Sequence, residues 1–294
     1  MKKTLIILCF CTGIPALSIL FAGNDTGTFI NDAYNTLIRA FDKGKRVVRP
    51  IKNPIEYNLE CLNDAEDMGL GTLINLGKEL ENMSLDVLST PVSIAEEEAL
   101  GEELVISVSS KYELIESGPK YDEIQKVSRD LIKNIKNPKG FTYEVYLMKS
   151  EDLNAFTAGA KIFITEKMYD FCASTDELAC IIGHEIYHNE LGHINRHLQK
   201  SNTLTPIGAG LVSFFTIPFG QQDETISDLK GIDLAFASGY NACVSVDLWN
   251  RFKEETKEGN YNTVENLFRS HPYSSKRADC NSKHIENNYG VSCE

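Results

Sequence analysis

The feature that most constrains this chain is the pentapeptide His184-Glu185-Ile186-Tyr187-His188. Residues four apart on an α-helix lie one turn apart on the same face, so both imidazoles can bind one metal ion. The glutamate beside the first histidine can accept a proton from a water molecule at that ion. Zinc lowers the pKa of such a water toward about 7 and polarises a peptide carbonyl. The pattern therefore predicts a helix that binds one zinc ion and supports peptide hydrolysis, with Glu185 as the general base.

The residues around this motif favour a buried helix. The preceding segment, residues 176–182, is apolar and compatible with a helix, which predicts that the motif lies inside the fold. The alternative is a pair of histidines that satisfy hydrogen bonds of the core without binding metal. A catalytic zinc ion needs a third protein ligand and one open position, so the rest of the sequence has to supply that ligand.

A third histidine at short spacing is not predicted. The metzincin pattern would require glycine at position 191 and histidine at position 194, where this chain has Leu191 and Ile194. His193 follows His188 by five residues, about 140° around a continuous helix, and is therefore expected to point away from the metal.

A later acidic pair offers the missing ligand. Glu224 and Asp228 are four residues apart, so a helix places both on one face. Glu224 is predicted to bind the metal with His184 and His188, and Asp228 to accept a hydrogen bond from a ligand histidine and fix its tautomer. The alternative is a solvated helix start, where acidic residues are favoured in any case.

Several separated segments together resemble the HtpX-like and CAAX prenyl endopeptidase type of gluzincin metallopeptidases. The resemblance covers roughly residues 91–279. The matching segments are, in order, Glu96–Gly101, Asn154–Gly159, His184–His188, Glu224 with Asp228, Gly239–Asn241, and His271-Pro272 followed by Arg277.

The resemblance implies roles for further residues. His271 is expected to stabilise the oxyanion of the tetrahedral intermediate as a second catalytic residue, and Arg277 to organise the site beside it. An extended or unfolded polypeptide is expected to pair with the backbone of one segment along the cleft. That segment comprises Asn154, Ala155, Phe156, Thr157, Ala158 and Gly159.

The pattern of apolar residues predicts an α+β fold that is mainly α, with a small β-sheet, and the resemblance makes this a zincin-like domain with the sheet beside the active-site helix. Ser93 and Glu96 form a capping-box signature at the start of a helix. A second helix is expected over residues 121–135, strands over residues 141–147 and 161–165, and further helices after residue 176.

The amino terminus predicts export. Lys2 and Lys3 precede an apolar run over residues 5–22, which is typical of a secretory signal peptide over residues 1–23, and an uncleaved membrane anchor is the alternative. We expect a helical extension over residues 24–90 and the zinc metallopeptidase domain over residues 91–294.

The chain departs from the family's usual pattern at Tyr187 and at residues 225–227, and no further membrane helix is expected after the signal. The resemblance therefore points to a compact, exported branch that acts in the periplasm on misfolded or misassembled envelope proteins, with outer-membrane assembly components as possible partners.

The apolar segment over residues 204–219 motivates an alternative: a zinc-stabilised, chaperone-like binding or assembly factor with weak or gated proteolysis.

Charge and cysteine content bear on partners and compartment. The formal net charge of −13 repels phosphate backbones and argues against a nucleic-acid partner. Six of the eight cysteines follow the predicted signal: Cys61, Cys172, Cys180, Cys243, Cys280 and Cys293. An even number in an exported chain suits disulfides. Proximity in the sequence suggests the pairs Cys172–Cys180 and Cys280–Cys293.

Overall fold

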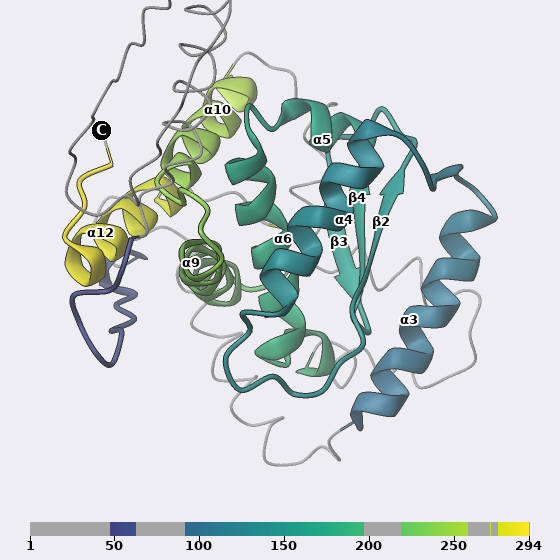
Figure 1. The fold of residues 1–294 in the computed structure, drawn as a ribbon, viewed down its shortest axis with the longest axis horizontal. Coiled ribbons are helices and arrows are strands. Elements are labelled where there is room, and N and C mark those ends of the chain that lie inside the picture. Colours follow the sequence, from purple (N-terminus) through teal and green to yellow (C-terminus); the bar gives the residue numbers. More distant parts are fainter. Residues whose placement is uncertain (1–47, 63–91, 197–218, 258–270, 272–275, 294) are drawn as a thin grey trace, which may run out of the picture. The chain divides into compact units, whose positions relative to one another are not determined.

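The computed structural model describes residues 48–62, 92–196, 219–257, 271 and 276–293, all of which belong to one compact unit over residues 46–294 (Figure 1). The predicted signal, residues 24–47 and 63–90 of the predicted extension, and the apolar segment up to residue 218 lie outside the described residues. None of the helices described is long and apolar enough to cross a membrane.

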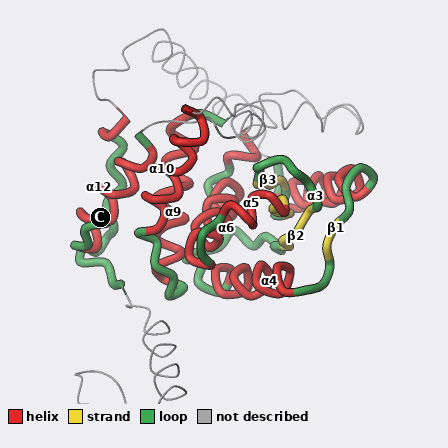
Figure 2. The backbone as a smooth tube through the Cα atoms, turned by 90° about the horizontal axis from the view of Figure 1, so that it is seen from above, coloured by secondary structure: helices red, strands yellow, loops and turns green. Residues whose placement is uncertain are grey.

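Helices make up most of the described chain, and a four-stranded sheet completes it, which confirms the predicted α+β class (Figure 2). In chain order the elements are η1 (Glu60–Leu62), α3 (Ile94–Ser109), β1 (Leu114–Ile115), α4 (Pro119–Ile132), β2 (Glu144–Met148), β3 (Ala155–Ala158), β4 (Lys161–Thr165), α5 (Glu166–Phe171), α6 (Thr175–Glu190), α9 (Gln221–Ala237), α10 (Val244–Lys257) and α12 (Arg277–Tyr289).

The sheet has the strand order β1-β2-β4-β3. β2 and β4 pair in parallel, with Leu147 opposite Ile164, whereas β1 and β3 pair with their neighbours in the antiparallel direction. Because β3 stands last in this order, it is an edge strand, and its outer side pairs with no other strand among the described residues. This is the strand that carries most of the predicted substrate-binding segment.

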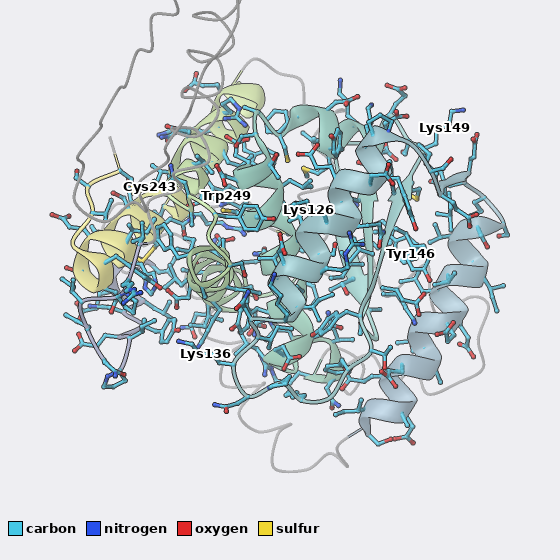
Figure 3. The ribbon with its side chains drawn as sticks, in the orientation of Figure 1. Lys126, Lys136, Tyr146, Lys149, Cys243 and Trp249 are labelled. Carbon is cyan, nitrogen blue, oxygen red and sulfur yellow. A yellow bond between two sulfur atoms is a disulfide. The ribbon has the colours of Figure 1, made fainter. Side chains whose placement is uncertain are left out.

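Helices cover both faces of the sheet. Ile162 and Ile164 of β4 are buried in the core that contains α4 and α6, while Phe163 between them packs with residues of α3. Side chains alternate between the faces of a strand, so this pattern places α3 on one face and α4 with α6 on the other. Tyr146, which Figure 3 labels, stacks on Phe163, and Phe156 also stacks on Phe163.

Two helices begin at or near the residues that the sequence predicts. The Ser93 side chain accepts a hydrogen bond from the Glu96 backbone while the Glu96 carboxylate accepts one from the Ser93 backbone, so the predicted capping box is present at α3. α4 starts at Pro119, two residues before the predicted start, since proline is well suited to the first helical turn.

Two glycines bring α6 and α9 into backbone contact. A Cβ atom added at Gly231 of α9 would lie 2.8 Å from the backbone nitrogen of His184, and one added at Gly183 would lie 3.0 Å from the Gly231 carbonyl oxygen. Side chains would therefore force the helices apart. Gly231 follows Glu224 and Asp228 at the spacing of one helix face, so the close approach delivers both carboxylates to the histidine motif.

The disulfides differ from the predicted pairs. Cys61 is bonded to Cys280, and Cys243 to Cys293. The predicted pairs Cys172–Cys180 and Cys280–Cys293 are therefore wrong, and Cys172 and Cys180 are free thiols. Cysteines that are near in sequence pair only when the fold orients them together. Here one bond joins α12 to Cys61, 219 positions earlier, and the other joins the segment after α12 to Cys243, 50 positions earlier.

The described part of the predicted extension, residues 48–62, is attached to the peptidase domain. Besides the Cys61–Cys280 bond, the Tyr57 hydroxyl donates a hydrogen bond of 2.5 Å to Asp233 of α9. The same carboxylate accepts hydrogen bonds from His284 and Tyr289 of α12, at 2.8 and 2.7 Å. This network ties the extension to the two helices that carry Asp228 and Arg277.

Candidate metal centre

The pentapeptide motif lies in the last two turns of α6, which begins after the N-cap residue Ser174. The Ser174 side chain accepts a hydrogen bond from the Glu177 backbone, and α6 then runs without interruption to Glu190. His184, Glu185 and His188 are all buried, as the apolar context of the motif predicts.

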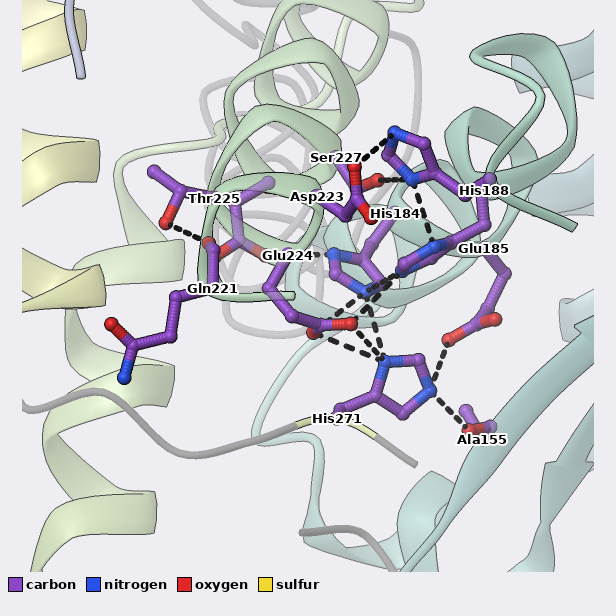
Figure 4. A network of polar contacts seen from close by, with 12 residues as sticks. Ala155, His184, Glu185, His188, Gln221, Asp223, Glu224, Thr225, Ser227 and His271 are labelled. Carbon is purple, nitrogen blue, oxygen red and sulfur yellow. Dashed lines mark hydrogen bonds and ion pairs between the residues drawn. The ribbon is translucent and has the colours of Figure 1, made fainter. Parts of the chain in front are cut away.

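Four side chains converge on one point at this place: His184, His188, Glu224 and His271 (Figure 4). His184 Nε2 lies 2.9 Å from His188 Nε2 and 3.3 Å from His271 Nδ1. The Glu224 carboxylate lies 3.4 Å from His188 Nε2, 3.6 Å from His184 Nε2 and 3.1 Å from His271 Nδ1. One ligand atom from each of the four residues lies within 4.8 Å of every other.

These distances fit a tetrahedral metal ion. Zinc holds nitrogen and carboxylate ligands at about 2.0 to 2.2 Å, so neighbouring corners of its tetrahedron lie roughly 3.3 to 3.5 Å apart. The donor set of imidazole nitrogens with one carboxylate is also the set that catalytic zinc sites use. The structure thus brings together the three ligands predicted from sequence, and it adds His271 at the fourth corner.

Asp228 and Arg277 support the ligand residues through hydrogen bonds. His184 Nδ1 donates a hydrogen bond of 2.8 Å to Asp228, which leaves Nε2 free for a metal ion. Arg277 donates two hydrogen bonds of 2.6 Å to the Asp228 carboxylate and one of 2.9 Å to Glu224. The guanidinium also lies 3.6 Å from the ring centre of Trp249, which covers it. The residues predicted to support the ligands therefore lie in contact with them.

The pKa values of this group follow from burial and from the charges beside it. Burial alone would raise the pKa of Glu224 and Asp228, but Arg277 and the neighbouring histidines outweigh it and hold both pKa values below their ordinary range. Burial lowers the pKa of His188 well below its usual value. A carboxylate that stays ionised and an imidazole that stays neutral are the protonation states that a metal ion needs.

His193 corrects one prediction. It does not point away from the site: its Nδ1 lies 3.1 Å from Nδ1 of His188, and its Nε2 lies 3.3 Å from an oxygen of Asp223. The prediction for His193 assumed a continuous helix. It fails because α6 ends at Glu190 and Gly192 turns the backbone at a φ of 71°. His193 is not one of the four clustered ligands, but it contacts the far nitrogen of one of them.

Glu185 lies beside the cluster without entering it. Its Oε1 is 3.5 Å from His271 Nε2, and its Oε2 has no hydrogen-bond partner among the described residues. Burial raises the pKa of this carboxylate, although His271 and His184 partly oppose the rise. A buried carboxylate with a raised pKa and one free oxygen is a stronger base than an exposed glutamate.

His271 lies among the clustered ligands, and its oxyanion role stays a prediction. Its Nδ1 faces the other three ligands, and its Nε2 donates a hydrogen bond of 3.1 Å to the Ala155 carbonyl (Figure 4). Glu224 and Glu185 outweigh burial and raise the pKa of this imidazole to about 9. Both ring nitrogens thus have polar partners in this arrangement.

The predicted substrate-binding segment divides between two faces of β3. Ala155 reaches the site through its carbonyl, and Thr157 lies under α6, where its hydroxyl accepts a hydrogen bond from Asn189. Phe156 and Ala158 belong to the core on the α3 face. Asn154, whose backbone bonds to Thr165, and Gly159, at the turn beside α3, stand at the two ends of the strand.

Sequence reasoning missed three contributions to the site. His193 contacts the ligand His188, and Trp249 contacts Arg277, which supports the ligands. Gly183 and Gly231 set the distance between the two helices that carry the ligands. The glycines carried a usable signal, because Gly231 shares a helix face with Glu224 and Asp228, and Gly183 directly precedes His184. Trp249, the single tryptophan of the chain, carried none.

Comparison with known proteins agrees with this geometry. Residues 120–209 match the model of peptidase family M48, and this segment contains the His184–His188 motif. The chain is 24% identical over 151 residues to the mitochondrial metalloendopeptidase OMA1 of Schizosaccharomyces pombe. That match covers 46% of this chain and 44% of the relative, so the chain spans less than half of the length of that protein. Glu224, Asp228, His271 and Arg277 lie outside the segment that matches the family.

Proposed function

We propose that this protein is a zinc-dependent metalloendopeptidase, because residues 120–209 match the model of peptidase family M48. The observation that carries the proposal is the convergence of His184, His188 and Glu224 on one point, with Glu185 beside it. Bound there, zinc would polarise the scissile carbonyl and lower the pKa of the attacking water.

The residues of the chain have separate tasks in this proposal. Glu185 accepts the proton of the attacking water, for which its raised pKa and its unpaired Oε2 suit it, and then delivers a proton to the leaving amine. Asp228 fixes the tautomer of His184, and Arg277 holds Asp228 and Glu224 in place. No covalent intermediate with the protein is required.

The edge strand β3 supports an extended polypeptide as the substrate. A chain that adds to the outer side of β3 would run past Ala155 and bring one peptide bond to Glu185. Only unfolded or locally extended chains can pair in this way. Together with the predicted signal peptide and the two disulfides, this favours a periplasmic enzyme of the HtpX-like type that acts on misfolded or misassembled envelope proteins.

The test compares wild type with Glu185→Gln. Purified protein is assayed on casein while bound zinc is measured by mass spectrometry. We expect Glu185→Gln to keep about one zinc ion per chain and to lose roughly 100-fold or more in rate, because only the base is removed. His188→Ala should lose both metal and activity. Equal rates for wild type and Glu185→Gln would refute the role of Glu185.

The second candidate function is that of an assembly factor whose proteolytic activity is gated. A catalytic zinc ion keeps one position open, whereas His271 Nδ1 stands at the fourth corner of this ligand group. Water and substrate would then enter only after His271 moves aside. Under this proposal His271→Ala cleaves casein faster than wild type, whereas a slower variant would support the oxyanion role. Rescue of an envelope-assembly defect by Glu185→Gln would favour an assembly function over proteolysis.

A further inference from the structure

A cavity beside Glu185 is not used by the chemistry described so far. Ala155 of β3 and His184 and Glu185 of the motif line one side of it, and residues of α9, α10 and α12 line the other. The centre of a water molecule can reach about 30 Å³ of it, and the space between atoms, open solvent included, amounts to about 460 Å³. Because it borders both the proposed general base and the edge strand, it lies where a side chain next to the scissile bond would enter.

Most of the cavity wall is apolar. The residues concerned are Cys180, Ile181, Ile232, Leu248, Trp249 and Phe252. A charged substrate side chain would lose its hydration here and would need a partner of opposite charge. Arg277 borders the cavity, but its guanidinium already bonds to Asp228 and Glu224. The cavity is therefore suited to an uncharged side chain.

Two polar side chains interrupt this wall. Asn281 of α12 and Ser245 of α10 are both buried and line the cavity. Neither the Oδ1 nor the Nδ2 atom of Asn281 has a hydrogen-bond partner in the described part of the chain, and the Oγ atom of Ser245 has none either. Buried polar atoms are nearly always hydrogen-bonded, to protein, ordered water or a ligand, so these three atoms are available to a polar group that enters the cavity.

We propose that this cavity selects glutamine or asparagine at a position next to the scissile bond, and that Asn281 is the residue that recognises it. A primary amide both donates and accepts, so a substrate amide can pair with both polar atoms of Asn281, and Ser245 supplies a further hydroxyl. This inference rests on the proposed peptidase function, because it names a preference of that same site.

Trp249 provides a test that does not depend on turnover. It is the only tryptophan in the chain and lines the cavity, so its fluorescence reports occupancy directly. The zinc-loaded full chain is titrated with N-acetylglutamine amide, N-acetylleucine amide and N-acetylglutamate amide. We expect the glutamine compound to bind at least about tenfold more tightly than the other two, since either competitor leaves Asn281 unpaired. Equal binding of the three compounds would overturn the proposal.

A cleavage assay tests the same preference in the active enzyme. Peptides that differ only in one residue flanking the cleaved bond are compared by kcat/KM. Wild type should prefer glutamine over leucine by at least about tenfold, and Asn281→Leu should reverse the order. Ser245→Ala, which makes a smaller change to the fold, should reduce the preference about threefold or more. Ser238→Ala is the matched control, since its buried hydroxyl also has no partner among the described residues but lies outside the cavity.

The outcomes separate this inference from the proposed function. Cleavage that requires Glu185 but shows no change of preference in Asn281→Leu and Ser245→Ala refutes the role of the cavity and leaves the peptidase intact. Absence of any zinc-dependent cleavage refutes the peptidase, and the proposed substrate selection fails with it. A selective Trp249 response in that case would show that the cavity binds amides without serving hydrolysis.

Discussion

Gly231 of α9 lies against the backbone of His184 in α6, so closely that a Cβ atom there would stand 2.8 Å from the His184 nitrogen. Real Cβ atoms do not approach backbone atoms to this distance, so a side chain must move one of the helices. The metal ligands come from both helices, and the geometry of the centre therefore depends on a residue that never touches the ion.

Gly231→Ala should weaken metal binding. Overpacking at a rigid contact costs about 1 to 3 kcal/mol, and here the displacement separates Glu224 from the two histidines. We expect at least about a tenfold loss of zinc affinity, measured by competition with a chromophoric chelator. Gly220→Ala is the control, because a Cβ atom at Gly220 meets only the Asp223 carboxylate at an ordinary 3.9 Å. Unchanged zinc affinity in Gly231→Ala would show that the helices can adjust.

His193→Gln should weaken metal binding through His188. His188 can donate its Nδ1 proton to His193, which passes a second hydrogen bond on to Asp223, and such outer partners typically affect metal affinity by about 10- to 100-fold. The same chelator competition measures the loss. His284→Gln, which changes a buried histidine bonded to Asp233, should reduce stability but keep the zinc affinity of wild type. A similar loss in both variants would mean that His193 acts on stability alone.

Removing the Cys61–Cys280 bond should lower stability more than removing Cys243–Cys293. The closed segments span 219 and 50 residues, and loop-closure entropy predicts losses of about 5 and about 4 kcal/mol as upper estimates. Paired Cys→Ser variants are compared by urea unfolding without a reducing agent. If the thermal midpoint of the wild type does not fall when a thiol reductant is added, neither disulfide contributes to stability.

Acid should destabilise the metal-free protein through Asp228. Arg277 and His184 outweigh burial and lower the pKa of Asp228 in the folded state, so the carboxylate contributes stability above its unfolded pKa of about 3.9. That contribution is lost as the pH falls through the lower, folded value. Urea unfolding at several pH values should show a decline below about pH 4 that is shallower in Asp228→Asn. Parallel curves for the two proteins would exclude this residue as the cause.

The sequence predicted the parts of the centre that obey helical spacing. His184 with His188, and Glu224 with Asp228, are pairs four residues apart on single helices, so their relative placement follows from helix geometry alone. His193 lies only five residues beyond His188, yet the estimate failed there because the helix ends between them. A helical angle is informative only while the helix continues.

Contacts between distant segments could not be predicted. The pairing of Cys61 with Cys280 depends on how residues 48–62 lie against α12, which no local pattern encodes. The position of His271 in the ligand group depends in the same way on a contact with Ala155, 116 residues earlier in the chain. Two of the four described strands, β2 and β4, were predicted, whereas β1 and β3 were not. The β4 bounds agree with the expected residues 161–165 because apolar residues there are buried on both faces.

The bond between Cys61 and Cys280 also closes the backbone between these two positions into a single covalent ring. One cut anywhere inside that ring opens it but releases no fragment. An enzyme of this kind that nicked its own chain would therefore migrate as an intact molecule on a non-reducing gel. Self-cleavage inside the ring would become visible only after the disulfide is reduced, so preparations should be checked for it under reducing conditions.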